Sequence, residues 1–449
     1  MVTHLIDYTL DKKGSLIRKM ILMRYEHTHK NHRDYTKELL LNLIKAELIS
    51  SSGYLTELAM KVNPKQYHSI HKLFSRVRFD YVSMQIEIIV MILLFFKITK
   101  VSISIDDSIV YRSRKRRVPN GHKQFDHAQK ANRSSFVFGQ KWLAFGLIIR
   151  IGGISMTLPL FIYLVKPKKN LISTTIAIQN MIRKVIEKRG LSIQVEIITD
   201  SWFARGRLIL RAKHQYNFST ITMARKDLII YEIPKIPKEK KVGRTKKYGA
   251  KIKPTLEDLT KEIRLSIYGK EAKVKYKEVV AKAKFLKGEI IKAVWLTYED
   301  SQSMRLLIAT DTTLSAEEII RRYSKRWDIE PMFNELKNRF RFKDIMMHTT
   351  QSYYQFLYFK IWCFIIIKLS SVEFKKKIID YIRDFLPWRV HHKKGVIITV
   401  GSTKLALKGI FSTLHIGLFS PKVAKNIDGD FENDEFLGIG LVRGYEMSG

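Results

Sequence analysis

The chain of 449 residues contains a single cysteine, Cys363. A disulfide bond within the chain is therefore impossible, and a metal site built on several cysteine thiolates is excluded. Cys363 lies in the apolar segment YFKIWCFIIIKL. Because free cysteine packs as a small apolar side chain, we expect a buried and unreactive thiol there.

Long uninterrupted apolar segments are also missing. One of the longest extends from Ile88 to Phe96, and Glu87 and Lys97 flank it, whereas a membrane-spanning helix needs about 20 mainly apolar residues. The N-terminal segment MVTHLIDYTLDKKGS has no apolar core of the kind that signal peptides contain. We therefore expect no membrane partner and a location in the bacterial cytoplasm, associated with the nucleoid.

Acidic residues are scarce: 42 Asp and Glu stand against 81 Lys and Arg, which gives a formal net charge of +39. Folding does not require such an excess of one sign, and nucleic acids are the partners that it suits best. The hydrophobic fraction of 45% is sufficient for packed cores. At about 150 residues per domain, the length predicts two or three domains.

The spacing of apolar residues changes along the chain and predicts its organisation. We expect an α/β protein with a mixed sheet flanked by helices, interrupted by a β-rich insertion domain and preceded by a helical N-terminal domain. The predicted segments are a helical DNA-binding domain (1–97), the first part of the core (98–225), a β-rich basic insertion domain (226–310), the last helix of the core (311–348) and a C-terminal helical region (349–449).

Aspartates follow two predicted strands of the core. ITKVSISIDDSIVYR alternates apolar and polar residues, as a strand does, and we expect that strand to end at Asp106 and Asp107. LSIQVEIIT predicts another strand, which leads directly into Asp200. Between them, Gly152 and Gly153 split a long apolar stretch into two strands of a predicted hairpin.

The segment RRYSKRWDIEPMFNELKNRF carries Tyr323, Arg326, Glu330 and Lys337 in the spacing Y-x2-R-x3-E-x6-K. Offsets of three, seven and fourteen residues return to nearly the same angle on a helix, so we expect one face of a helix over residues 314–340 to carry all four. One acid, two bases and a phenol make a poor core. They suit a surface that meets phosphates around a metal-binding carboxylate.

The ends and the interior of this helix carry further signals. Ser315 or Thr313 is the expected N-cap, with Glu317 or Glu318 in the first turn. Pro331 should kink the helix or disturb its hydrogen bonds just after Glu330.

Asp106, Asp200 and Glu330 together predict a metal site. Carboxylates at the ends of neighbouring strands, faced by one from a helix, can hold two divalent ions that stabilise the attacking and leaving oxygens of phosphoryl transfer. Mg²⁺ or Mn²⁺ suits such oxygen ligands and keeps positions open for water and phosphate. A single acid after a strand is weak evidence, but three in this order beside a basic helix face are much stronger.

With these residues in place, the chain resembles insertion-sequence DDE transposases of the IS4 type, whose signature is Y-R-E-K. The segments SIDDS, ITDSWF, GRTKKYG and IIRRYSKRWDIEPMFNELK carry the resemblance, which extends over about residues 101–348. It implies an RNase H-like catalytic core in which Asp106, Asp200 and Glu330 bind two Mg²⁺ or Mn²⁺ ions. Ser108 supports Asp106 as the first ligand, because that acid in the family typically precedes a hydroxyl residue by two positions, and Asp107 remains the alternative.

The resemblance also implies a reaction and partners. It implies metal-dependent nicking at transposon ends, a hairpin intermediate, and joining of the freed 3′-hydroxyl to target DNA. The partners would be double-stranded DNA of the terminal inverted repeats and of the target, and a second copy of the chain in a homodimeric synaptic complex. Arg326 and Lys337 would hold phosphates of the transposon end, and Tyr323 would position a phosphate by its hydroxyl.

An aromatic side chain could stack on the base that a hairpin leaves unpaired. Trp295, on the predicted strand KAVWLTY, is the candidate, and an ordinary core tryptophan is an equally good interpretation. Trp202 and Trp327 are expected to pack beside the acids.

Two other functions stay open on the sequence alone. One is an RNase H-like DNA nuclease or resolvase that cleaves without strand transfer. The other is a non-catalytic DNA-binding regulator, which the presence of all three acids disfavours.

Overall fold

The computed structural model describes residues 39–413, except for 41, 45, 49–53, 63, 77–79, 114–117, 127–133, 226–227, 235–245, 268–269, 300, 302, 392–394 and 397. Residues 1–38 of the predicted helical domain lie outside this part. So do residues 414–449 of the predicted C-terminal region and much of the basic stretches at 111–117 and 235–253.

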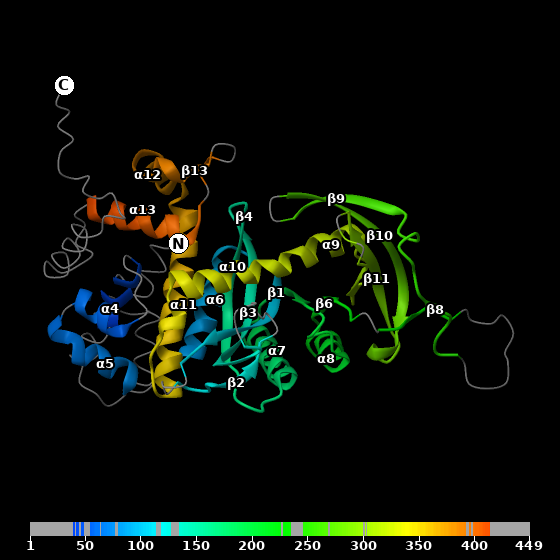
Figure 1. The fold of residues 1–449 in the computed structure, drawn as a ribbon, viewed down its shortest axis with the longest axis horizontal. Coiled ribbons are helices and arrows are strands. Elements are labelled where there is room, and N and C mark those ends of the chain that lie inside the picture. The colour runs from blue at the N-terminus through cyan, green and yellow to red at the C-terminus, as the bar shows by residue number, and fades with distance from the viewer. Residues whose placement is uncertain are drawn as a thin grey trace, which may run out of the picture.

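The core sheet consists of a three-stranded antiparallel meander followed by two strands parallel to its first strand (Figure 1). Its strand order is β4-β3-β1-β5-β6. β3 pairs antiparallel with β1, whereas β5 pairs parallel with β1 and β6 parallel with β5. This is the strand order of an RNase H-like fold, so the predicted mixed α/β fold is confirmed. The strands are β1 (Lys100–Tyr111), β3 (Phe136–Ile151), β4 (Ile154–Leu164), β5 (Gln194–Thr199) and β6 (Ser219–Met223), and β2 (His122–Phe125) pairs with the outer end of β3.

The hairpin predicted at Gly152 and Gly153 is present between β3 and β4. Both glycines have positive φ angles, of 55° and 78°, a conformation that other residues adopt only at a cost. β1, in contrast, does not end at Asp106 and Asp107, as the sequence suggested, but continues to Tyr111. It does so because β3 keeps pairing with it to that residue, while its pairing with β5 stops at Ile105.

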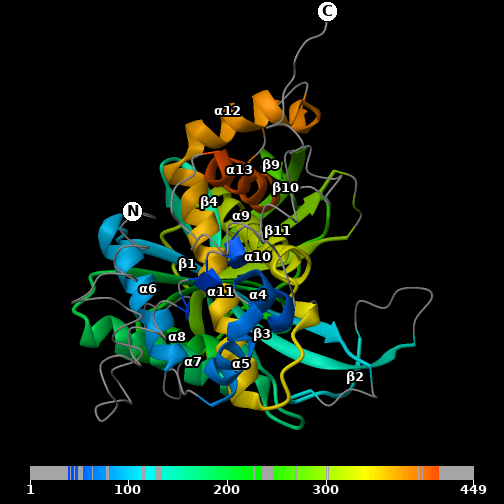
Figure 2. The same ribbon diagram turned by 90° about the vertical axis from the view of Figure 1, so that its left-hand side faces the viewer.

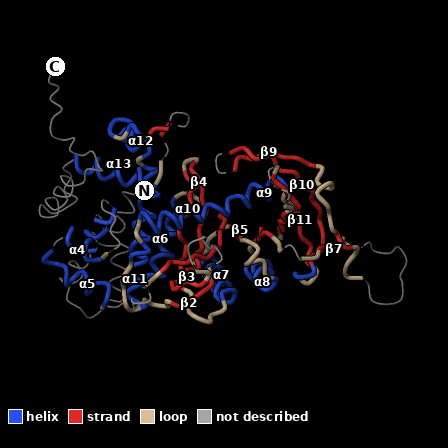
Figure 3. The backbone as a smooth tube through the Cα atoms, in the orientation of Figure 1, coloured by secondary structure: helices blue, strands red, loops and turns tan. Residues whose placement is uncertain are grey.

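The insertion extends the same sheet rather than forming a separate one (Figure 3). Its last strand pairs antiparallel with β6, with Leu307 opposite Met223. The insertion strands therefore stand in hydrogen-bonded continuity with β5 and β1. They are β7 (Ile230–Tyr231), β8 (Lys251–Ile252), β9 (Lys261–Ile267), β10 (Lys270–Ala283), β11 (Glu289–Tyr298) and β12 (Arg305–Ala309), with a 3₁₀ turn at Lys284–Leu286.

Helices cover both faces of the sheet. Val101 and Ile103 of β1 point toward Ile182 and Ile186 of α7 (Leu171–Lys188), where α6 (Tyr81–Phe95) also packs. The opposite face of the sheet lies under the segment of residues 316–339, called here the motif segment, which runs across it toward α11 (Figure 1). α8 (Gly206–Tyr216) connects β5 to β6 and packs beside α7.

The motif segment is not the single regular helix expected over residues 314–340. It begins as α9 (Ala316–Ser324), tightens to a 3₁₀ turn at Lys325–Asp328, resumes as α10 (Ile329–Asn334) and ends as a π-helical turn at Glu335–Arg339. Pro331 has no N–H to donate to Trp327 and its ring would crowd that carbonyl. The 3₁₀ turn that contains Trp327 therefore lies before Glu330, whereas the disturbance was expected just after it.

The predicted start of the motif segment is confirmed. Ser315 is the N-cap, and its hydroxyl accepts the backbone N–H of Glu318 at 3.2 Å. The Glu318 carboxylate in turn accepts the N–H of Ser315 at 3.1 Å. This reciprocal capping box satisfies two backbone donors that the first turn would otherwise leave unpaired.

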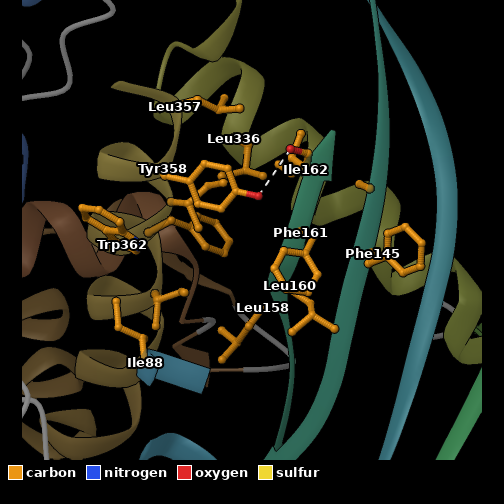
Figure 4. Packing of buried hydrophobic residues seen from close by; sticks show 14 of the residues in the cluster. Ile88, Phe145, Leu158, Leu160, Phe161, Ile162, Leu336, Leu357, Tyr358 and Trp362 are labelled. Atoms are coloured by element: carbon orange, nitrogen blue, oxygen red, sulfur yellow. Dashed lines mark hydrogen bonds between the residues drawn. The ribbon is translucent and has the colours of Figure 1, made fainter. Parts of the chain in front are cut away.

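One helix, α11 (Thr350–Glu373), is long and apolar enough to cross a membrane, so the expectation that no segment reaches that length is wrong. Of its most apolar 18-residue window, 83% is buried inside the protein. Tyr358 donates a hydrogen bond from its hydroxyl to the carbonyl of Ile162 on β4, at 3.5 Å (Figure 4). The apolar residues of α11 therefore pack in the protein core, and α11 is a central packing helix.

The remaining helices pack around α11, as the two perpendicular views show (Figures 1 and 2). Phe74 contacts Phe356 and Phe359 of α11 edge-on, with ring centroids 5.2 and 5.6 Å apart. The elements are α4 (Leu55–Val62), α5 (Tyr67–Ser75), α12 (Lys375–Phe385) and α13 (Val400–Thr413), with 3₁₀ turns at Pro64–Gln66, Phe342–Asp344 and Pro387–Arg389 and a short hairpin of β13 (Val390–His391) and β14 (Gly395–Val396).

A fully buried ion pair links this helical layer to α11. Lys360 Nζ lies 3.0 Å from Glu47 Oε1, and neither side chain is exposed. We predict that Lys360→Met lowers the free energy of unfolding by about 3–5 kcal/mol, because it removes the ammonium bonded to a buried carboxylate and leaves that carboxylate with the charge of Lys404 nearby. The double variant Glu47→Gln/Lys360→Met should recover at least half of that loss. Urea denaturation measures both, and an equal loss in the single and double variants would contradict the prediction.

Candidate active site

The even-numbered residues of β1 form a polar face. Ser102, Ser104, Asp106 and Ser108 point to one side of the strand because side chains alternate. The odd-numbered Val101, Ile103 and Ile105 are buried in the main core instead. The strand thus separates a polar face from an apolar one, and the polar face lies beneath the motif segment.

Side chains along this polar face bind the motif segment directly. Ser104 donates from its hydroxyl to the carbonyl of Arg326 at 3.2 Å. The guanidinium of Arg326 lies 3.3 Å from a carboxylate oxygen of Asp106. About three helical turns further on, Lys337 donates to the hydroxyl of Ser108 at 2.5 Å and to the carbonyl of Ile109 at 3.2 Å. These contacts dock the motif segment along the strand.

Asp106 and Asp200 lie next to each other at the edge where the parallel pairing of β1 and β5 ends. Ile105 is in register with Thr199, so the next residues on the two strands are these aspartates. The Asp200 carboxylate accepts the backbone N–H groups of Trp202, at 3.0 Å, and Phe203, at 3.3 Å. The two aspartates that the sequence analysis assigned to one site therefore lie on adjacent strands at the same level of the sheet.

Burial acts on the charge of both aspartates. It raises the pKa of Asp106 to about 7, against the opposing effect of the Arg326 guanidinium, and the neighbouring negative charges of Asp200 and Asp107 add to the rise. Burial likewise raises the pKa of Asp200, while hydrogen bonds from Phe203 and the charge of Arg326 oppose it. The site therefore disfavours two adjacent anions unless a cation lies close to them.

Asp107, the alternative first ligand, points to the other side of β1. Its carboxylate lies 2.8 Å from the ammonium of Lys141 on β3. Strand alternation thus gives the two consecutive aspartates different surroundings. The geometry places Asp106, and not Asp107, on the face that carries the motif segment.

Arg326 connects two of the three predicted acids. Besides Asp106, its guanidinium reaches Glu330, with 3.6 Å between Nη2 and Oε1. The side chain is buried, and its Nε has no hydrogen-bond partner among the described residues. The Trp327 ring centroid lies 4.6 Å from the guanidinium carbon. A buried cation with an unused donor therefore sits between the acids.

The other two residues of the Y-R-E-K signature are also turned toward the sheet rather than outward. Tyr323 is buried in the cluster that α9 forms with the insertion strands, and burial raises its pKa to about 12. Burial lowers the pKa of Lys337. Glu330, in contrast, is exposed, although partial burial raises the pKa of its carboxylate. The expected face exists, but most of it is packed on the sheet.

Trp295 is not brought to this site. Its indole is only 5% exposed and packs in a core cluster with Ile209 and Ile308. Tyr323 belongs to a different cluster, on the opposite face of the insertion strands. The interpretation as an ordinary core tryptophan therefore applies. The exposed indoles beside the acids are Trp202 and Trp327, at 39% and 37%.

Gly146, which the sequence analysis did not single out, allows the motif segment to approach the sheet. It lies opposite Ser104 in the β1–β3 register. A Cβ at this position would stand 2.8 Å from a Thr157 methyl group and 3.3 Å from the Ile329 side chain, which adjoins Glu330. A glycine in the interior of a strand is the signal that could have indicated this close approach.

The donor chemistry of the site fits a hard divalent cation. Asp106 and Asp200 present adjacent carboxylate oxygens on one edge, and Glu330 is linked to them through Arg326. Oxygen ligands of this kind are those that Mg²⁺ and Mn²⁺ prefer. In the part of the chain that the structure describes, no three Asp, Glu, His or Cys side chains already form a metal cluster.

Comparison with known proteins identifies the enzyme class. Residues 167–366 match the family model of the transposase DDE domain, and the match includes Asp200 and the whole Y-R-E-K segment but begins after Asp106. No curated protein sequence matches the chain. The chain is similar to the solved structure of a piggyBac transposase synaptic complex with hairpin DNA at 10% sequence identity and a TM-score of 0.39, over 100% of this chain and 86% of that chain. The match to the transposase DDE domain over residues 167–366 supports a DDE transposase enzyme.

Proposed function

We propose that this DDE transposase is of the IS4 type, nicks DNA at transposon ends, excises the element through a hairpin and joins the freed 3′-hydroxyl to target DNA. The single observation that carries the proposal is the register of β1 and β5, which sets Asp106 beside Asp200 under the segment that bears Glu330. Carboxylates gathered from two strands and one helix in this way suit phosphoryl transfer with two metal ions.

Asp106, Asp200 and Glu330 would hold two Mg²⁺ or Mn²⁺ ions. When bound, these ions lower the pKa of a water molecule and stabilise the attacking and leaving oxygens of the phosphate. Asp106 and Asp200 are largely buried where β1 and β5 stop pairing, and the Arg326 guanidinium offsets part of their charge.

Arg326 and Lys337 are suited to hold backbone phosphates of the DNA. Arg326 presents planar N–H donors next to the carboxylates, including the Nε that has no partner among the described residues, and a guanidinium binds phosphate oxygens with two donors at once. Lys337 is fixed in place by Ser108 and Ile109. Tyr323, whose pKa is raised to about 12, stays protonated and donates a hydrogen bond.

Hairpin formation requires a sharp bend of one strand, which leaves a base without its stacking neighbours. Trp202 is suited to receive such a base, because its indole is partly exposed and its backbone N–H binds the Asp200 carboxylate. Arg205 lies over the same ring, with 5.9 Å between its guanidinium carbon and the ring centroid. Trp202 thus replaces Trp295 as the proposed stacking residue.

The proposed partners are the duplex DNA of the terminal inverted repeats and of the target. The net charge of +39 supports this, because contacts to phosphates supply most of the affinity for DNA. Two transposon ends must be held together during excision, so we propose a homodimer in the synaptic complex and a location at the bacterial nucleoid.

The two consecutive aspartates of β1 provide a matched test of the catalytic site. We predict that Asp106→Asn lowers the rate of nicking of an end-containing duplex by at least about a thousand-fold, because it removes a metal-binding carboxylate. Asp107→Asn, which removes the same charge from the face that meets Lys141, should change the rate by less than about ten-fold. Both variants should bind the duplex as the wild type does. A wild-type rate in the Asp106 variant would refute the site.

The product pattern of the same assay decides between related functions. Wild-type protein with Mg²⁺ or Mn²⁺ should yield nicks, hairpins and strand-transfer products on an electrophoretic gel, and a chelator should abolish all three. Nicks without joining would instead indicate an RNase H-like nuclease. DNA binding without any cleavage would indicate a regulator.

Trp202 and Trp295 should respond differently to the same substitution. Trp202→Ala should leave the thermal unfolding midpoint nearly unchanged and reduce the yield of hairpins relative to first-strand nicks, because stacking on the bent strand is lost. Trp295→Ala should lower the free energy of unfolding by about 3–5 kcal/mol, because it leaves a cavity in the core. An unchanged ratio of hairpins to nicks in Trp202→Ala would exclude the stacking role.

A further inference from the structure

A polar cavity lies on the face of the sheet that carries the active site, at the opposite end of β1. It has a volume of about 460 Å³. It opens where β1 and β5 begin and where the β3–β4 hairpin turns, below the end of α9. Its charged and hydroxyl-bearing lining residues, called here the basic pocket, include Lys100, Ser102, Arg150, Glu196, Arg322 and Lys325.

The single acid of the basic pocket is fully engaged. Glu196 is buried, its Oε1 lies 2.9 Å from the guanidinium of Arg322, and its Oε2 accepts the hydroxyl of Ser102 at 3.1 Å. Arg322 is held on its other side by Glu318, at 3.0 Å. This ion pair is therefore a fixed wall of the pocket and leaves no free carboxylate to neutralise its other cations.

Three further cations surround the pocket without such compensation. Lys100, Arg150 and Lys325 are exposed, and none forms an ion pair with a carboxylate of the described residues. They come from three different elements, namely β1, β3 and the 3₁₀ turn of the motif segment. Like charges brought together by the fold around one cavity favour the binding of an anion.

The position of the pocket identifies the anion. Ser102 and Asp106 are four residues apart on the same face of β1, which corresponds to about 13 Å along the strand. Between them, Ser104 holds the motif segment through the carbonyl of Arg326. About 13 Å is also the rise of roughly four base pairs along the axis of duplex DNA, at 3.4 Å per nucleotide of one strand, so the count applies to a duplex whose axis follows β1.

We propose that the basic pocket binds a backbone phosphate of DNA roughly four nucleotides away from the phosphate that reacts at Asp106 and Asp200. This inference rests on the proposed function, since it takes the reacting strand to lie at those carboxylates. The bound phosphate belongs either to the transposon end or to the target duplex. The chemistry of recognition is the same for both, and the experiment separates them.

The test uses full-length protein with the double variant Arg150→Gln/Lys325→Gln. The matched control is Lys184→Gln/Lys188→Gln, which removes two exposed cations from α7, on the opposite face of the sheet. Binding to a labelled end duplex is measured over a range of salt concentrations. If the end occupies the pocket, the slope of log affinity against log salt should fall by about two units in the pocket variant and not in the control.

A second arm addresses the target duplex. Complexes with a pre-cleaved end are saturated with protein and then supplied with target DNA. If the target occupies the pocket, strand transfer should fall at least about ten-fold in the pocket variant while the salt slope for the end duplex stays at the wild-type value. A pocket variant that matches the control in both arms overturns the inference.

The failure of the inference can be told from a failure of the proposed function. The salt slope requires no cleavage, so the first arm is informative even if the wild type proves inactive. Conversely, loss of nicking in Asp106→Asn together with an unaltered pocket variant would leave the catalytic proposal intact and remove only the phosphate subsite. Unfolding curves of both double variants verify that each is folded.

Discussion

The contact of Arg326 with Asp106 and Glu330 is the interaction on which the rest of the site depends. A buried guanidinium is costly unless carboxylates accompany it, and adjacent buried carboxylates are costly unless a cation does. Here the guanidinium of Arg326 and the carboxylate of Asp106 offset each other's charge. The backbone of Arg326 is also held by Ser104, so a single residue joins the polar face of β1 to the segment that bears the third acid.

The insertion contributes to the site through the continuity of the sheet. β12 pairs with β6, which pairs with β5, the strand that ends at Asp200. β11, which pairs with β12, packs Val294 and Leu296 in one cluster with Ile319 and Ile320 of α9. The motif segment is therefore packed on the insertion at its start and hydrogen-bonded to β1 at its centre and end.

Local signals in the sequence were sufficient for several parts of this arrangement. The N-cap at Ser315 and the hairpin at Gly152 and Gly153 depend on interactions between close neighbours in the chain, and both are present. The strand leading into Asp200 is also present, and its apolar residues had indicated it. A disturbance of the helix was expected just after Glu330, but a 3₁₀ turn lies before it, because the sequence shows that proline removes a backbone donor and not on which side the helix adjusts. Trp295 was ambiguous because an apolar strand residue can face a core or a ligand equally well.

The sequence by itself determined the polar alternation of β1, the order of the three acids and the spacing of the Y-R-E-K residues. These follow from local periodicity and from side-chain chemistry. Only the tertiary structure shows that Asp106, and not Asp107, lies on the strand face that meets the motif segment. It also decided the location of the basic pocket, whose cations at positions 100, 150 and 325 are far apart in the chain. Their proximity arises from long-range strand pairing, which no local pattern specifies.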